Sequence, residues 1–157
     1  MQIQSMFKVI ITAFLLALPN LGSAETILTV RKSEKSVSYT LEELLELPLT
    51  TVVTGNDYVD GATSFQGPRL RLVLDALNVD QSANLRMTAL NDFSSDVPAS
   101  DAFNYDVILA VYRDGEAMSV RDKGPIWLIY PMDDHPSLQD EDYNGRLVWQ
   151  LKHILVE

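Results

Sequence analysis

Val107-Ile108-Leu109-Ala110-Val111-Tyr112 is the most apolar strand that the sequence predicts, and Ile126-Trp127-Leu128-Ile129-Tyr130 is a second strand of the same kind. A continuous apolar run of this length, bounded by turn residues, is typical of a strand that is buried on both faces. Asp114-Gly115 lies between the two runs and is a strong hairpin signal. We therefore expect the core of the protein to be built on strands.

Shorter elements lie on both sides of these runs. Alternating or β-branched residues predict further strands, at residues 26–30, 37–39, 50–54, 85–90, 118–120 and 147–156. Residues 55–64 and 93–100 are rich in Gly, Asn, Asp, Ser or Pro, and we expect them to be loops.

Short helices are predicted between the strands. Thr40 and Glu43 form a capping box that begins the first helix, which has to end before Pro48. The second helix follows residues 65–68, and a short helical turn spans about 99–104. The buried stripe of the second helix consists of Leu70, Val73, Leu74 and Leu77. Strands and helices without a repeating βαβ order indicate a mixed, strand-rich α+β domain.

The first 24 residues have the three-part pattern of a secretory signal peptide. Lys8 precedes an apolar run at residues 9–18, and Gly22-Ser23-Ala24 offers the small residues that a signal peptidase reads. The run is roughly half as long as a membrane-spanning helix requires. We expect cleavage after Ala24, which leaves a periplasmic protein with a single domain at residues 25–157 and no direct membrane insertion.

Charge and composition exclude several classes of function. The chain carries 12 Lys and Arg against 22 Asp and Glu, and this net charge of −10 disfavours binding to nucleic acid. It has no cysteine and only 2 histidines, which disfavours disulfides, cysteine nucleophiles and zinc sites. No GxSxG motif is present, which argues against a serine hydrolase. The acidic residues at 133–142 lack EF-hand spacing and indicate a solvated face.

Three polar segments are candidates for a binding site. Residues 121–125, Arg-Asp-Lys-Gly-Pro, place two cations on a loop before a buried strand, and a solvated hairpin end is an equal interpretation. Residues 91–98 place carboxylates and Phe93 after a strand; they suit a flat heterocycle, and an Asx turn is the alternative. Residues 65–69 begin a helix that attracts anions, although a hydrophobic lead-in is the more common case.

The order of these pieces resembles the molybdopterin-binding fold of the sulfite oxidase superfamily over roughly residues 40–156. The first similar segment is Phe-Gln-Gly-Pro-Arg followed by a Leu-rich helix, at 65–74. The second is Asn-Asp-Phe-Ser with Val-Pro and Val-Ile-Leu-Ala, at 91–94, 97–98 and 107–110. The third is Asp-Gly-Glu-Ala-Met with Asp-Lys-Gly-Pro and Tyr-Pro, at 114–118, 122–125 and 130–131. The resemblance implies an α+β fold of the sulfite oxidase type.

The sequence departs from the enzymes of this superfamily at two places. Those enzymes hold molybdenum with a cysteine after an early strand, and the corresponding residues 50–55 read Thr-Thr-Val-Val-Thr-Gly. Trp127 stands where the enzymes tend to carry an arginine after Gly-x-Pro, and tryptophan cannot bind a cofactor phosphate. The resemblance and its departures together imply a pterin pocket without molybdenum.

The string at residues 121–131 also looks like small periplasmic pterin-binding regulators, the PruR-like proteins. This resemblance implies that the chain binds a reduced pterin such as tetrahydromonapterin and is not an enzyme. It further implies contact with the periplasmic domain of a membrane-bound cyclic di-GMP cyclase or phosphodiesterase. The alternatives are a molybdopterin-dependent oxidoreductase and a plain interaction domain whose pocket is closed by side chains.

The resemblance also implies ligand-binding roles for single residues. Asp92 is expected to accept hydrogen bonds from the amino-pyrimidine edge of the pterin. Arg121 and Lys123 are expected to donate to its carbonyl or side-chain hydroxyls. The residues expected to stack on the ring are Phe93, Trp127 or Phe65, and Arg69 and Tyr130 complete the set. For Trp127 and Tyr130 the strong alternative is core packing, because alternate strand residues usually face a core.

Overall fold

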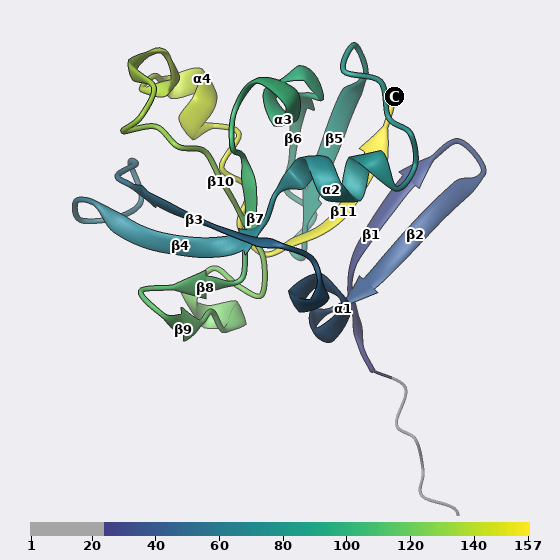
Figure 1. Cartoon of the computed structure of the whole chain (residues 1–157), viewed down its shortest axis with the longest axis horizontal. Helices are drawn as coiled ribbons and strands as arrows, with labels where there is room; N and C mark the ends of the chain where they lie inside the picture. Colours follow the sequence, from purple (N-terminus) through teal and green to yellow (C-terminus); the bar gives the residue numbers. More distant parts are fainter. Residues whose placement is uncertain (1–23) are drawn as a thin grey trace, which may run out of the picture.

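The computed structural model describes residues 24–157 and shows a mixed, strand-rich α+β fold, as predicted (Figure 1). The predicted signal peptide, residues 1–24, lies outside the described residues except for Ala24. Within residues 24–157 every helix is too short or too polar to cross a membrane.

The described chain begins with the predicted hairpin, which is formed by β1 (Thr26–Lys32) and β2 (Lys35–Thr40). The capping box then starts α1 (Leu41–Glu46). The Thr40 hydroxyl accepts from the Glu43 N–H at 3.2 Å, and the Glu43 carboxylate accepts from the Thr40 N–H at 2.8 Å. These bonds satisfy backbone donors that the start of a helix leaves free, which explains why the helix begins here.

The larger sheet has five strands in the order β2-β1-β11-β5-β6. β11 (Leu151–Val156) lies parallel to β1 and antiparallel to β5 (Asn84–Ala89), and it starts later than the predicted residue 147. β6 (Ser94–Pro98) forms the edge of the sheet, where the sequence predicted a loop. Ladder hydrogen bonds to β5 override the turn-forming residues of this segment.

The second sheet contains β3 (Leu49–Thr54), β4 (Thr63–Pro68), β8 (Tyr112–Arg113) and β9 (Glu116–Ala117) in that order. Residues 65–68 thus form the end of a strand, and this strand leads through Arg69 into α2, as predicted. Gly67 permits this course, because a Cβ at this position would overlap the backbone carbonyl of Leu109. Asp114-Gly115 forms the predicted hairpin turn, but its second strand is β9 and not residues 118–120.

The two most apolar stretches form β7 (Ile108–Ala110) and β10 (Trp127–Ile129), which pair antiparallel. Every residue of both strands is buried, which confirms the burial that the sequence predicts. A small core cluster lies on their common face with β3 and β4. Its buried members are Val52, Phe65, Ile108, Ala110, Met118, Trp127 and Ile129.

The main core packs the five-stranded sheet against α1 and α2 (Leu70–Asp75), and Figure 1 shows α2 crossing β5 and β11. The helix ends before Leu77, but Leu77 still joins this core. The remaining elements are α3 (Ser100–Asn104), α4 (Glu141–Asn144) and the 3-10 turns η1 (Val120–Asp122) and η2 (Pro136–Leu138).

Candidate functional site

An aromatic pocket lies where the loops after β3, β5 and α4 meet. Its walls include the rings of Tyr58, Phe93 and Trp149, and the first and last of these meet edge to face at 5.0 Å between centroids. The cavity volume is about 150 Å³, which is small beside the roughly 300–1,000 Å³ of sites for drug-sized ligands. The cavity is therefore too small for a drug-sized ligand. Its other lining residues are Ala89, Asn91, Asn144, Gly145 and Leu147.

The turn between β5 and β6 decides which side chains line this pocket. The Ala89 N–H donates to the Phe93 carbonyl and the Asp92 N–H donates to the Ala89 carbonyl, which closes a tight hairpin loop. Asp92 takes a left-handed position with φ of 66°, as the third residue of such a loop commonly does. Asn91 and Phe93 consequently face the pocket, on the side of the turn away from Asp92.

Asp92, which was expected to bind the ligand, lies on the opposite side of this turn from the aromatic pocket. Its carboxylate lies 2.8 Å from the Lys152 ammonium on β11, and it is not part of the pocket lining. The hydrogen bond from Lys152 lowers the pKa of Asp92 below its usual value. Asp92 is therefore a surface carboxylate paired with Lys152, outside the aromatic pocket.

Two amide side chains supply the polar part of the pocket. The Asn91 Oδ1 accepts from the Phe93 N–H at 3.2 Å. The Asn144 Oδ1 accepts from the Asp57 N–H at 3.1 Å, and its Nδ2 donates to the Asp140 carbonyl at 2.9 Å. These bonds fix which end of each amide is the oxygen. The lining among the described residues contains no acid and no base.

Lys123 lies against the outer wall of the pocket. Its Nζ is 4.6 Å from the ring centroid of Trp149 and 5.9 Å from that of Tyr58. The backbone of Lys123 is held in place because its carbonyl accepts a hydrogen bond from the Gln150 N–H at 2.9 Å. A cation over aromatic faces contributes about 0.5–2 kcal/mol. Among the predicted site residues, Phe93 and Lys123 are those that the structure brings to this pocket.

Phe65 and Trp127 were expected to stack on a ligand, and the structure places both in the small core. Each has 0% exposure, and their rings pack edge to face at 5.3 Å. The Trp127 Nε1 donates to the Leu147 carbonyl at 3.1 Å. Trp127 also lies 6.5 Å from Trp149, so that it supports the pocket wall from behind. Core packing, the stated alternative for Trp127, is the role that the geometry supports.

Tyr130 is likewise a core residue and lies away from the pocket. Its hydroxyl donates to Asp101 Oδ2 at 2.7 Å, and Arg146 Nη1 bonds to the same oxygen at 2.8 Å. Burial, followed by the nearby Asp101 charge, raises the pKa of Tyr130 well above its usual value. This network ties α3 to the segment that carries Asn144, so it supports the pocket without entering it.

Arg121 and Arg69 also lie outside the aromatic pocket. Arg121 is exposed on η1. Arg69 is on the surface at the start of α2, where it bonds to Asp106 at 3.2 Å and to the Thr50 hydroxyl at 3.2 Å. The geometry gives neither side chain a place in the ring-binding lining.

Residues 50–55, where the resemblance to the sulfite oxidase superfamily implies a metal-binding cysteine, end β3 without a thiol. Two hydrogen bonds hold the end of this strand against Asp133. The Gly55 N–H donates to Asp133 Oδ2 at 2.9 Å, and the Asp133 N–H donates to the Thr54 hydroxyl at 3.1 Å. Within the described part of the chain no group of three or more His, Cys, Asp or Glu side chains is placed to hold a metal. The donor set does not fit thiolate-held molybdenum, whereas the aromatic pocket offers ring faces on which a flat heterocycle can stack.

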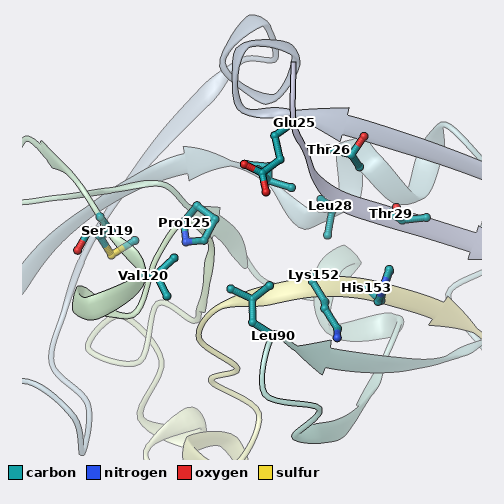
Figure 2. A pocket seen from close by; sticks show the side chains of 12 residues that line it. Glu25, Thr26, Leu28, Thr29, Leu90, Ser119, Val120, Pro125, Lys152 and His153 are labelled. Carbon is teal, nitrogen blue, oxygen red and sulfur yellow. The ribbon is translucent and has the colours of Figure 1, made fainter. Parts of the chain in front are cut away.

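Two further cavities flank the aromatic pocket. A polar one of about 220 Å³ shares Asn144 with it and is also lined by Gly55, Asn56 and Gln139. On the other side of the β5–β6 turn, a groove of about 460 Å³ lies between the start of β1 and β11, with Leu90 on its wall (Figure 2). This larger groove is mainly apolar and contains none of the predicted site residues.

The pocket residues that the sequence did not single out are Tyr58, Asn144 and Trp149. They come from two distant parts of the chain, the loop after β3 and the segment formed by α4 and the residues that follow it, and no local motif marks them. Asn91 was within a predicted segment, but no role was assigned to it. The usable signal was the position of these loops at strand ends, where binding groups are commonly displayed.

Both the sequence and the fold of this chain are similar to those of known proteins. The model of the family described as oxidoreductase molybdopterin binding domain matches residues 16–133. The fold is similar to the crystal structure of the sulfane dehydrogenase SoxCD from Paracoccus pantotrophus, with a TM-score of 0.62 and 21% sequence identity. The similarity covers 82% of this chain and 37% of that chain, so this protein spans little more than a third of that structure's length. A search of curated proteins found no match.

Proposed function

Because the chain belongs to the oxidoreductase molybdopterin-binding domain family, we propose that it binds a pterin and does not hold molybdenum. One observation carries this proposal: an aromatic pocket walled by Tyr58, Phe93 and Trp149 lies beside a thiol-free strand end at residues 50–55. Stacking of a heterocyclic base on an aromatic side chain contributes roughly 1–3 kcal/mol. The aromatic side chains of the pocket thus offer surfaces on which the pterin ring can stack, while the cysteine that would hold the metal is absent.

The proposed ligand is a reduced pterin with a hydroxylated side chain, of the tetrahydromonapterin type. The aromatic pocket accommodates the bicyclic ring, and the polar cavity beyond Asn144 gives room for side-chain hydroxyls. Lys123 packs over the ring of Trp149 and so supports this wall of the pocket.

We propose a reporting role and no catalysis. The protein would be exported to the periplasm and would contact the periplasmic domain of a membrane-bound cyclic di-GMP enzyme. The β5–β6 turn supports such a role, because Phe93 lines the pocket while Leu90 of the same turn is exposed on the groove side. A ligand that fixes Phe93 therefore also fixes part of the surface.

The test is to purify the exported protein without oxygen and to measure its bound pterin by fluorescence after oxidation, its molybdenum content, and its affinity for tetrahydropterin by calorimetry. We expect a metal-free pterin and saturable binding. Stoichiometric molybdenum with oxidase or reductase turnover would instead establish the alternative, a molybdopterin-dependent oxidoreductase. Absence of affinity for any reduced pterin would favour a plain interaction domain.

A partner is tested with a Leu90→Ser variant. Loss of control over the cyclic di-GMP enzyme with unchanged pterin affinity is the expected result. The matched control is Leu49→Ser, an exposed leucine on β3 outside the pocket and the groove. Equal signalling by the Leu90→Ser variant and the unmodified protein would refute the assigned role of the turn.

A further inference from the structure

We infer that the free edge of β3 pairs antiparallel with β3 of a second copy of this chain, about a two-fold axis at Thr51. The inference goes beyond the proposed function and does not rest on it. β3 is the outermost strand of the four-stranded sheet and lies on the side of β4 away from β8 and β9 (Figure 1). Its residues line neither the aromatic pocket nor the larger groove.

The backbone groups of alternate residues in β3 face away from β4. Ser64 of β4 uses both of its backbone groups on the β8 side, because its carbonyl accepts from the Asp114 N–H at 2.7 Å and its N–H donates to the Asp114 carboxylate at 3.1 Å. Val53 is opposite Ser64, and opposite residues in an antiparallel pair exchange either both hydrogen bonds or none. The N–H and C=O of Val53 therefore face outward, and the alternation along the strand gives Leu49 and Thr51 the same orientation.

The rest of the described chain leaves these outward groups uncovered. Gly55, two residues beyond Val53, has the same orientation, and its N–H is capped by Asp133 Oδ2 at 2.9 Å. The backbone groups of Leu49, Thr51 and Val53 have no such hydrogen bond to a side chain anywhere in residues 24–157. All three side chains are exposed, Leu49 by 37% and Val53 by 54%. The cap at Gly55 thus protects only the end of the edge.

The other outer strands of the two larger sheets carry features that prevent pairing with a further strand. β6 contains Asp96 and ends at Pro98. β2 begins with Lys35 and pairs with β1 through a register shift, and β9 has only two residues, one of them Glu116. β3 reads Leu-Thr-Thr-Val-Val-Thr and has no charge, no proline and no register shift. It is therefore the outer strand whose edge can accept another strand.

The order of side chains along β3 makes a second copy the matching partner. Antiparallel pairing centred on Thr51 places Thr51 opposite itself and Leu49 opposite Val53 of the second copy, so that every outward residue meets another outward residue. Each such pair exchanges two hydrogen bonds, and Thr–Thr and aliphatic pairs across strands add stability. The axis sets no like charges against each other, although the chain has a net charge of −10. Leu49→Ser and Leu49→Ala keep every backbone group of the edge, so the pairing and the pterin pocket persist in these control variants.

Sedimentation velocity of the full exported protein over a range of concentrations measures the pairing, and we expect a reversible equilibrium between monomer and dimer. Thr51→Lys sets two like charges across the axis and should weaken the dimer about tenfold or more. The matched control is Ser36→Lys at an exposed residue of β2, which should leave the dimer unchanged. Thermal unfolding checks that both variants are folded. A monomer at every concentration, or equal association by Thr51→Lys and the unmodified protein, would overturn the inference. Slow hydrogen exchange at Thr51 only in the presence of another protein would overturn it in favour of that partner.

Single-cysteine variants test the register, because the chain has no cysteine of its own. Opposite residues that exchange hydrogen bonds in antiparallel strands lie about 5.5 Å apart at Cα, which is within the range of a disulfide. Under oxidation by diamide, Thr51→Cys should therefore crosslink to itself, and Leu49→Cys should crosslink when mixed with Val53→Cys but not alone. Ser36→Cys is the matched control and should remain without a crosslink. Crosslinking of Leu49→Cys alone as fast as in the mixture, or no faster crosslinking of Thr51→Cys than of Ser36→Cys, would show that the two-fold pairing at Thr51 is wrong.

Discussion

Two groups of aromatic rings lie next to each other and do different things. Phe65 and Trp127 are on strands, are fully buried and pack edge to face within the small core. Tyr58, Phe93 and Trp149 are on loops and keep part of their surface accessible, where they wall the pocket. The rings are chemically alike in both groups, and the backbone around each ring decides whether it is buried in the core or stays accessible in the pocket.

The buried group should give the largest effect on stability. Trp127→Ala removes a fully buried side chain, and Phe or Trp to Ala changes in cores cost about 3–5 kcal/mol. We expect the free energy of unfolding to fall by this amount in urea denaturation. A smaller loss than for Trp149→Ala would contradict the division between the two groups.

The Tyr130 network should give the next largest effect on stability. Tyr130→Phe removes a 2.7 Å bond to the Asp101 carboxylate, and a hydrogen bond to a charged group contributes about 1.5–3 kcal/mol. Urea denaturation at neutral pH measures the loss. Unchanged stability would show that Arg146 alone satisfies Asp101.

The buried phenol of Tyr130 should also make the stability of the fold decrease at alkaline pH. Burial raises the pKa of Tyr130, so the folded state keeps the phenol proton that the unfolded chain releases near pH 10. This contribution to stability is complete below that pH and decreases as the pH rises above it. The dependence should be weaker in Tyr130→Phe, as measured by unfolding at pH 9 to 11. If the unmodified protein and Tyr130→Phe lost stability equally as the pH rises, the loss would come from groups other than Tyr130.

The exposed group should affect ligand binding more than folding. Phe93→Ala is expected to weaken tetrahydropterin binding by about 1–3 kcal/mol, because one stacking surface is lost. Its effect on unfolding should be small, since the side chain is 54% exposed. Leu49→Ala is the matched control and should leave the affinity unchanged. A stability loss in Phe93→Ala comparable to that of Trp127→Ala would make Phe93 a core residue.

Asp92→Asn should give the smallest effect. The carboxylate is exposed and faces Lys152, so its removal is expected to leave pterin affinity unchanged. Calorimetry of the variant checks this. A loss of tenfold or more would restore the role that the sequence suggested for Asp92.

Local signals explain what the sequence predicts well. The capping box at Thr40 and Glu43, the first hairpin and the apolar runs of β7 and β10 each depend on residues close together in the chain. β6 was missed because its pairing with β5 outweighs the preferences of its own residues. The burial of Trp127 could be predicted from its apolar strand, whereas its packing against the ring of Phe65 could not.

The pocket was harder to predict because it is assembled from distant loops. Phe93 was identified from its own segment, while Tyr58 meets Asn144 and Trp149 only in the folded chain. Asp92 and Phe93 are adjacent in sequence, yet the left-handed backbone at Asp92 sends their side chains to opposite sides of the turn. A one-residue difference of this kind depends on the type of turn, which the sequence did not specify.

The central claim is that the exposed rings bind a pterin without molybdenum. It is tested most directly by anaerobic calorimetry of tetrahydropterin with the metal-free protein and with its Trp149→Ala and Leu49→Ala variants. We predict saturable one-to-one binding to the unmodified protein and to Leu49→Ala, and a loss of about 5- to 150-fold in Trp149→Ala, the range that corresponds to 1–3 kcal/mol of stacking. Equal affinity in Trp149→Ala, or binding that appears only after molybdenum is added, would contradict the claim.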